Sequence, residues 1–211
     1  MTLYLPEWNE HYHSKHGAIN EALHVFINAG LRYFLATSQK DRVSILEIGF
    51  GTGLNALLTQ LFSVENQLKI NYTGIEAYPL GLSEIKQLNY PKILNIPLHY
   101  FLKLHETPWG SLVEISETFR LEKRKQFFSE ITDTQLFDII YFDAFGARVQ
   151  PELWTEIIFE RMFAALKEGG ILVTYAAKSS VRRAMLAVGF TVEKLAGPPG
   201  KREMLRAVKS V

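Results

Sequence analysis

Short apolar runs alternate with amphipathic stretches along most of this chain. Four runs are short enough for buried strands, at residues 43–48, 69–76, 137–143 and 171–176. Between the first two, leucines recur at the spacing of one helix face, at positions 54, 57, 58 and 61. Alternating strands and helices predict an α/β fold with a mostly parallel sheet and helices on both faces.

The second half of the chain adds four further elements. Pro151 suits the first turn of a helix with one apolar face, and Gly169-Gly170 is expected to end it. Ser179 or Ser180 is expected to cap a shorter helix. Residues 190–195 and 202–208 then form two strands, and the loop between them is too short for a crossover helix, so they should pair antiparallel.

Two stretches depart from this alternation. Residues 91–130 contain several prolines and allow one predicted strand, 117–125, inside an irregular insertion. Residues 1–40 are predicted to be mainly helical from Ile19 to Ala36. The 211 residues are therefore interpreted as a single domain, with an N-terminal helical or lid segment at 1–40 and a Rossmann-like core at 41–211.

Composition narrows the protein class. The chain is 47% apolar and 21% charged, which is ordinary for a globular protein. It has no cysteine, which excludes disulfides, thiolate nucleophiles and cysteine-ligated metals and favours a reducing compartment. No basic stretch followed by an apolar one opens the chain, and no apolar run approaches the length of a membrane span. We therefore expect a soluble, unprocessed cytoplasmic protein.

Charge is unevenly distributed although the formal net charge is only +1. From Lys178 to the end, eight Lys or Arg residues stand against Glu193 and Glu203. A basic C-terminal segment on an otherwise acidic body is typical of a phosphate-binding face, and it is also typical of a solvated helix face beside a strand edge.

The strongest chemical signal lies between the first two strands. Residues 47–55 read Glu-Ile-Gly-Phe-Gly-Thr-Gly-Leu-Asn, and glycine at positions 49, 51 and 53 lets the backbone turn sharply and approach a ligand. Glu76 ends the second strand, 23 residues after Gly53. In doubly wound folds an acid at this place accepts hydrogen bonds from ribose hydroxyls. The pair predicts a nucleoside-cofactor site.

This pattern resembles the first motif of class I S-adenosylmethionine-dependent methyltransferases. The resemblance implies a seven-stranded, mostly parallel sheet with an antiparallel last strand and S-adenosyl-L-methionine as cofactor. It also implies cofactor contacts for the acid before the glycines, the turn itself, the ribose acid and the carboxylate after the 137–143 strand. These residues are Glu47, Gly49, Phe50, Gly51, Gly53, Asn55, Glu76 and Asp143. The family tends to place Gly-Asp near the adenine, where this chain has Lys-Arg-Lys-Gln-Phe at 123–127, so the adenine contacts stay unassigned.

Further segments resemble the methyltransferase half of the bifunctional MnmC family. They are Tyr-His-Ser-Lys-His-Gly-Ala at 12–18, Phe-Asp-Ala-Phe-Gly-Ala at 142–147 with Gln-Pro-Glu-Leu-Trp at 150–154, Val-Arg-Arg at 181–183 with Gly-Phe at 189–190, and Gly-Lys-Arg-Glu-Met at 200–204. The resemblance implies methylation of the 5-aminomethyl nitrogen of uridine 34, often 2-thiolated, in tRNA. It implies that Tyr12 and Lys15 lie near the cofactor or the uridine.

The basic C-terminal segment supplies candidate contacts for the anticodon-arm phosphates: Lys178, Arg182, Arg183, Lys201 and Arg202. MnmC carries a second, FAD-dependent half that exposes the amine, and 211 residues leave no room for it. We therefore expect a stand-alone enzyme whose amine is supplied by a separate enzyme system.

By resemblance Asp143 is also the catalytic carboxylate beside the methyl group. A primary alkylamine has a pKa of about 10.4, so an ordinary aspartate with a pKa of about 3.9 is some six units too weak, roughly 8 kcal/mol, for complete proton transfer. We favour Asp143 as a hydrogen-bond acceptor that orients the amine while water takes the proton. Base catalysis by an aspartate with a strongly raised pKa stays open.

Other functions remain open at this stage. His11, His13 and His16 are close in sequence, but methyl displacement requires no metal, so no metal is expected. One alternative is another enzyme on the same scaffold, such as a small-molecule methyltransferase or a spermidine-synthase-like aminopropyltransferase. The other is a non-catalytic RNA-binding module. Binding of S-adenosylmethionine and dependence of turnover on RNA would discriminate among them.

Overall fold

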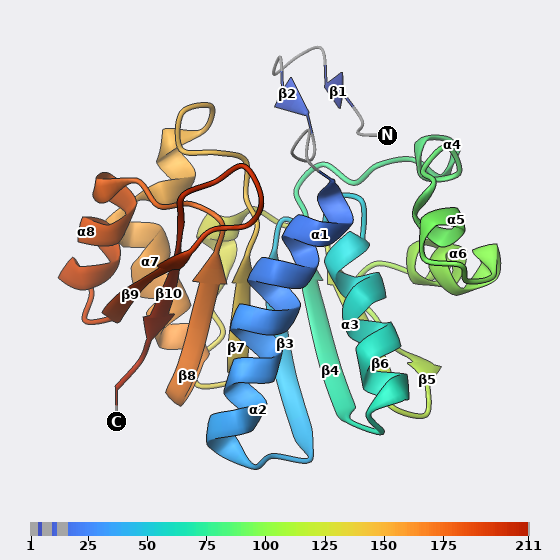
Figure 1. The fold of residues 1–211 in the computed structure, drawn as a ribbon, viewed down its shortest axis with the longest axis horizontal. Helices are drawn as coiled ribbons and strands as arrows, with labels where there is room; N and C mark the ends of the chain where they lie inside the picture. Colours follow the sequence, from blue (N-terminus) through green and yellow to red (C-terminus); the bar gives the residue numbers. More distant parts are fainter. Residues whose placement is uncertain (1–3, 6–9, 12–16, 211) are drawn as a thin grey trace.

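A central eight-stranded sheet organises the computed structural model, which describes residues 4–5, 10–11 and 17–210 (Figure 1). The strand order is β5-β6-β4-β3-β7-β8-β10-β9. Neighbours from β6 to β8 run parallel, whereas β10 is antiparallel to both β8 and β9, and β5 is antiparallel to β6. The sheet strands are β3 Arg42–Ile48, β4 Lys69–Ile75, β5 Leu112–Ser116, β6 Phe119–Arg124, β7 Phe137–Phe142, β8 Leu166–Thr174, β9 Thr191–Ala196 and β10 Glu203–Val208.

The predicted α/β class, parallel centre and antiparallel last strand are confirmed. The strand count differs by one, because β5 pairs with the predicted third strand as a hairpin at the sheet edge. This edge strand is mostly exposed or half-buried, so it lacks the apolar run that marks a buried strand.

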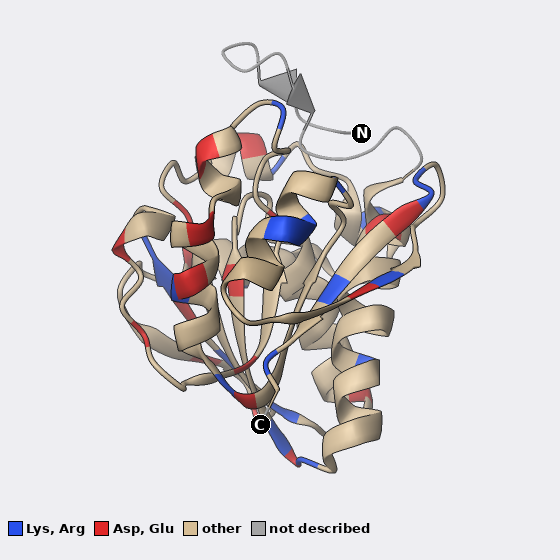
Figure 2. Ribbon diagram, turned by 90° about the vertical axis from the view of Figure 1, so that its left-hand side faces the viewer, with Lys and Arg blue, Asp and Glu red and all other residues tan. Residues whose placement is uncertain are grey.

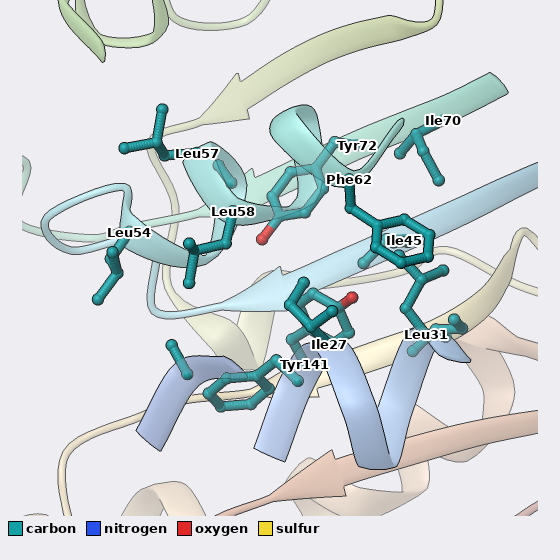
Figure 3. Packing of buried hydrophobic residues seen from close by; sticks show 14 of the residues in the cluster. Ile27, Leu31, Ile45, Leu54, Leu57, Leu58, Phe62, Ile70, Tyr72 and Tyr141 are labelled. Atoms are coloured by element: carbon teal, nitrogen blue, oxygen red, sulfur yellow. The ribbon is translucent and has the colours of Figure 1, made fainter. Parts of the chain in front are cut away.

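Helices cover both faces of the sheet. One continuous helix, built from α1 Ala18–Ala22, the π-helical η1 Leu23–Arg32 and α2 Tyr33–Ser38, packs on one face beside α3 Leu54–Glu65. Figure 3 shows this layer, with Ile27 and Leu31 pointing at Ile45, Tyr72 and Tyr141 of the strands. The opposite face carries α7 Glu156–Ala165 and α8 Ser179–Ala187.

Alternate residues along each strand divide between these two cores. Tyr141 faces the first helix layer, whereas its neighbour Phe142 faces the second. The remaining elements are short: β1 Tyr4–Leu5, β2 Glu10–His11, α4 Leu82–Ile85, α5 Tyr90–Ile93, α6 Leu98–Glu106, η2 Phe128–Glu130 and η3 Pro151–Trp154.

Three local predictions were wrong. The helix expected from Pro151 is interrupted at Thr155, which is extended, and it ends at Ala165. Gly169 and Gly170 lie inside β8, where the pairing with β7 shifts register, so they accommodate a bulge. Lys178 occupies the N-cap of α8 without a side-chain bond, and both serines lie in the first turn.

Candidate functional site

The glycine turn joins β3 to α3 at the carboxyl edge of the sheet. Gly49, Gly51 and Gly53 have φ angles of 89°, 47° and 70°, which L side chains rarely adopt. A Cβ on Gly49 would lie 2.8 Å from the Asp143 carbonyl oxygen, and one on Gly53 would lie 2.8 Å from His105 Nε2. The turn therefore needs glycine for both its conformation and its packing.

Glu76 lies against this turn, directly after β4. Its Oε2 accepts a hydrogen bond from the Gly51 backbone N–H at 3.0 Å, and its Oε1 accepts one from the Tyr78 N–H at 3.0 Å. Burial raises the pKa of Glu76, and these two backbone bonds oppose that rise. The structure thus brings the predicted ribose acid and the glycines together in one place.

Asn55 links two carboxylates at the start of α3. Its Nδ2 donates to Glu47 Oε1 at 2.9 Å and to Asp143 Oδ2 at 2.9 Å. Burial raises the pKa of Glu47 well above its ordinary value, and the charge of Asp143 adds to the rise. Burial also raises the pKa of Asp143, to about 7, against the opposing effect of the Asn55 bond.

Phe50 supports the turn from the core side. Its side chain is 3% exposed and packs on Gly74 of β4, where a Cβ would lie 2.4 Å from the Phe50 ring. The ring also makes edge contacts with His105 and Trp109. Of the predicted cofactor contacts, Phe50 therefore reaches the site through its backbone and not its ring.

Two exposed aromatic residues beside Glu76 were missed by the sequence analysis. Tyr78 is 67% exposed and Phe127 is 52% exposed, and their ring centroids lie 6.0 Å apart. They follow the ends of β4 and β6, which are adjacent strands. The position of Tyr78, two residues after the ribose acid, was the signal in the sequence that could have revealed it.

A pocket of about 520 Å³ opens between the loop after β7, the end of β8 and the β9–β10 loop. Of the predicted substrate contacts, Lys178, Lys201 and Arg202 line it. Arg148 and Tyr175 also line it and were not predicted. Tyr12 and Lys15 lie outside the described residues.

Arg182 and Arg183 lie on α8, which follows the pocket residue Lys178. Figure 2 shows Lys and Arg positions on α8 and on the strands beside it, with acidic positions among them. Several C-terminal basic residues are already engaged: Lys194 with Glu203, Arg206 with Glu193, Lys201 with Glu21, and Lys209 with the carbonyls of Phe163 and Leu166.

The remaining basic residues are those available to a ligand. Among residues 4–5, 10–11 and 17–210, no ion pair involves Lys178, Arg182, Arg183 or Arg202. The predicted phosphate contacts without an ion pair are therefore Lys178 and Arg202, which line the pocket, and Arg182 and Arg183, which lie on α8.

Known proteins resemble this chain in sequence and in structure. A family model described as S-adenosyl-L-methionine-dependent methyltransferase matches residues 118–210. The solved structure of MnmC2 from Aquifex aeolicus aligns with a TM-score of 0.74 and 25% identity over 98% of this chain and 66% of that one. Residues 118–210 thus match this methyltransferase family, and the chain is similar to MnmC2 over nearly its whole length. S-adenosyl-L-methionine is its cofactor. The glycine turn and the Glu76 carboxylate lie together at the carboxyl edge of the sheet.

Two curated proteins that this chain resembles are both MnmC proteins. The tRNA 5-methylaminomethyl-2-thiouridine biosynthesis bifunctional protein MnmC of Magnetococcus marinus is 27% identical over 98% of this chain, and that of Methylobacillus flagellatus is 26% identical over 96%. The chain spans about a third of the length of these relatives, 32% and 33%. Spermidine synthase from Thermotoga maritima shares the fold, with a TM-score of 0.61 at 15% identity.

The described residues contain neither a metal-ligand group nor a membrane-spanning helix. No group of three or more His, Cys, Asp or Glu side chains there could hold a metal ion. No helix in the same residues has the length and apolarity needed to cross a bilayer. His13 and His16 are outside the described residues.

Proposed function

We propose that this enzyme transfers the methyl group of S-adenosyl-L-methionine to the 5-aminomethyl nitrogen of uridine or 2-thiouridine 34 in tRNA. The observation that carries the proposal is Asp143, whose carboxylate accepts a hydrogen bond from Asn55 at the start of α3 and which lies three residues before Gly146, the first lining residue of the 520 Å³ pocket. The MnmC relatives, which cover nearly the whole chain, support the same substrate.

The cofactor end of the site is assigned as follows. Glu76 binds the ribose, because a carboxylate at the end of this strand can accept two hydroxyl hydrogen bonds. Tyr78 and Phe127 flank the adenine, since exposed aromatic rings next to the ribose acid can stack on a base. Glu47 and Asn55 lie toward the amino-acid end, beside the glycine turn.

When bound, the cofactor supplies a methyl group on a positively charged sulfur, and the protein has to align an unprotonated amine with it. Asp143 accepts a hydrogen bond from the amine and so orients its lone pair. The raised pKa of Asp143, about 7, narrows the gap to an alkylamine to about 3 units, or about 5 kcal/mol. Full proton transfer to Asp143 is still uphill, so orientation remains its main role and water receives the proton.

Basic side chains around the pocket hold the tRNA. Lys178 and Arg202 line the pocket, and Arg182 and Arg183 follow on α8. Phosphate contacts of this kind position the anticodon arm, whereas the pocket selects the modified base. Tyr12 and Lys15 remain predicted contacts.

Mass spectrometry of nucleosides tests the substrate directly. In tRNA from a strain lacking this gene, 5-aminomethyluridine or its 2-thio form should accumulate and the methylaminomethyl form should disappear. Purified enzyme with S-adenosyl-L-methionine should then restore the methylated nucleoside in that tRNA. An unchanged nucleoside profile, or a purified enzyme that ignores this tRNA, would contradict the proposal.

A further inference from the structure

An acidic residue outside the predicted site lies beside the pocket. Glu21 is on α1, and its Oε1 forms an ion pair with Lys201 Nζ from the β9–β10 loop. Figure 1 shows this loop rising next to the start of α1. The Glu21 side chain is 14% exposed and that of Lys201 is 32% exposed, so water only partly screens the pair.

The second oxygen of Glu21 has unused bonding capacity. Among the described residues, Glu21 Oε2 is buried and accepts no hydrogen bond. An ionised carboxylate can accept about four hydrogen bonds, and a buried oxygen without a donor is costly. Glu21 therefore has room for a second donor besides Lys201.

Glu21 and Asp143 act on each other electrostatically. The negative charge of Glu21 raises the pKa of Asp143, whereas the positive charge of Lys201 lowers it. Since Coulomb effects fall with distance, the three groups belong to one site. Two carboxylates with a single cation between them leave an excess negative charge there.

The contacts of Lys201 indicate the kind of group that this site binds. Its Nζ lies 3.9 Å from the centroid of the Tyr175 ring, while its ion pair is with Glu21. The Tyr175 hydroxyl donates to the carbonyl of Ala144 at 2.7 Å, which fixes the ring next to Asp143. A primary alkylammonium is thus held by a carboxylate and an aromatic face, the arrangement that favours cations.

We propose that Glu21 and the Tyr175 ring form an ammonium subsite for the acceptor, and that Lys201 fills this subsite until tRNA binds. The inference rests on the proposed function and specifies its substrate class. A 5-aminomethyl group is also a primary alkylammonium, so it replaces Lys201 between Glu21 and Tyr175. Water then takes its proton beside Asp143, which leaves the neutral amine that accepts the methyl group. The subsite selects cationic substituents over uncharged ones and repels those that carry a carboxylate.

The test compares two tRNAs that differ only at the modified base. One carries 5-aminomethyluridine and is the methyl acceptor, and the other carries uncharged 5-hydroxymethyluridine and serves as a competitive inhibitor. The wild-type enzyme should bind the aminomethyl form about tenfold more tightly. Glu21→Gln should bring this ratio close to one by raising KM, and it should leave the Kd for S-adenosyl-L-methionine and the inhibition constant of the hydroxymethyl tRNA unchanged.

Two further variants complete the test. Glu160→Gln makes the same charge change on the exposed side of α7 and should keep the wild-type ratio. Lys201→Met removes the resident ammonium, so the preference for aminomethyl tRNA should rise above the wild-type value. If the Glu21–Lys201 ion pair only supports the fold, Glu21→Gln and Lys201→Met should each weaken the binding of both tRNAs equally.

The outcomes separate the two proposals. If the wild type methylates aminomethyl tRNA but Glu21→Gln keeps the tenfold ratio, the ammonium subsite is wrong and the proposed function stands. If Glu21→Gln fails to fold, an unchanged ratio in Lys201→Met overturns the subsite by itself. If the wild type does not methylate aminomethyl tRNA, both proposals fall.

Discussion

At the scale of single residues, the centre of this enzyme is an amide between two carboxylates. Asn55 uses both N–H bonds of its side chain, one for Glu47 and one for Asp143. Glu47 lies in the core beside Tyr72 and Tyr141, whose rings Figure 3 shows in the packed layer. Burial raises the pKa values of both tyrosines, and the charge of Glu47 adds to the rise. Burial therefore opposes the ionisation of both acids.

Replacing Asp143 by asparagine should therefore stabilise the apo-protein at alkaline pH. The folded-state pKa of about 7 lies above the ordinary value of 3.8, so the native state loses stability as pH rises from about 4 through 7. An asparagine side chain at this position would keep the bond from Asn55 without ionising. Because Asp143 is only partly buried, we expect a gain of about 1–2 kcal/mol at pH 8 relative to pH 5. Urea unfolding of both proteins at the two pH values measures it.

The same variant separates orientation from cofactor binding. Asp143→Asn should lower the turnover number by at least about 100-fold, because a positioned hydrogen-bond acceptor is lost, while the Kd for S-adenosyl-L-methionine changes less than about threefold. Calorimetry and single-turnover methyl transfer give the two values. Equal losses in both would assign Asp143 to cofactor binding, and a stability gain that does not depend on pH would contradict the raised pKa.

At the scale of elements, the strand-to-helix turns decide how much the sequence could predict. The glycine turn was predictable because Gly49, Gly51 and Gly53 meet a backbone demand that few sequences satisfy. Strand β7 was predictable because all six of its residues are buried. By contrast, Gly169 and Gly170 serve a bulge inside β8, and sequence alone does not distinguish a bulge glycine from one that ends a helix.

The turn can be tested with a matched pair of glycine variants. Gly49→Ala combines a φ of 89° with a contact of 2.8 Å to the Asp143 carbonyl oxygen. Gly110→Ala has a similar φ of 76°, but its Cβ would meet nothing within 4 Å. Gly110→Ala should therefore cost about 1 kcal/mol of stability, and Gly49→Ala about 2–4 kcal/mol together with most of the cofactor affinity. Thermal unfolding and calorimetry should show this difference, and equal effects would mean that the close approach is relieved without cost.

At the scale of the whole molecule, the fold brings residues distant in sequence to one edge of the sheet. Glu21, Asn55, Glu76, Asp143 and Lys201 come from five separate segments, and only contacts across the fold unite them. Sequence spacing identified the pair of Gly53 and Glu76, because a single βα unit connects them. It missed Glu21, because nothing local marks a helical glutamate whose partner lies 180 residues away.

The ion pairs of the folded molecule also could not be predicted from the sequence. Counting charges gave a C-terminal segment with a net positive charge, in which β9 and β10 pair Lys194 and Arg206 with Glu203 and Glu193 of the opposite strand. Among the described residues, fewer cations are thus without an ion pair than the sequence suggested. Of the predicted phosphate contacts, Lys178 and Arg202 line the pocket together with Arg148, and Arg182 and Arg183 lie on α8.

Under the proposed function, the number of phosphates that Lys178, Arg182, Arg183 and Arg202 contact sets the salt dependence of tRNA binding. Each contact releases counterions worth a slope of about −0.7 to −0.9 in log K against log salt concentration, so four contacts give a slope of about −3. Affinity for tRNA should then fall about 50–150-fold between 50 and 200 mM salt. Replacing Arg183 by Met should reduce the slope by about 0.8, because one phosphate contact is lost. Lys69→Met, at the start of β4 and so at the opposite edge of the sheet, should leave the slope unchanged. Filter binding or anisotropy over a salt series gives these slopes, and a flat wild-type series would rule out phosphate contacts at these positions.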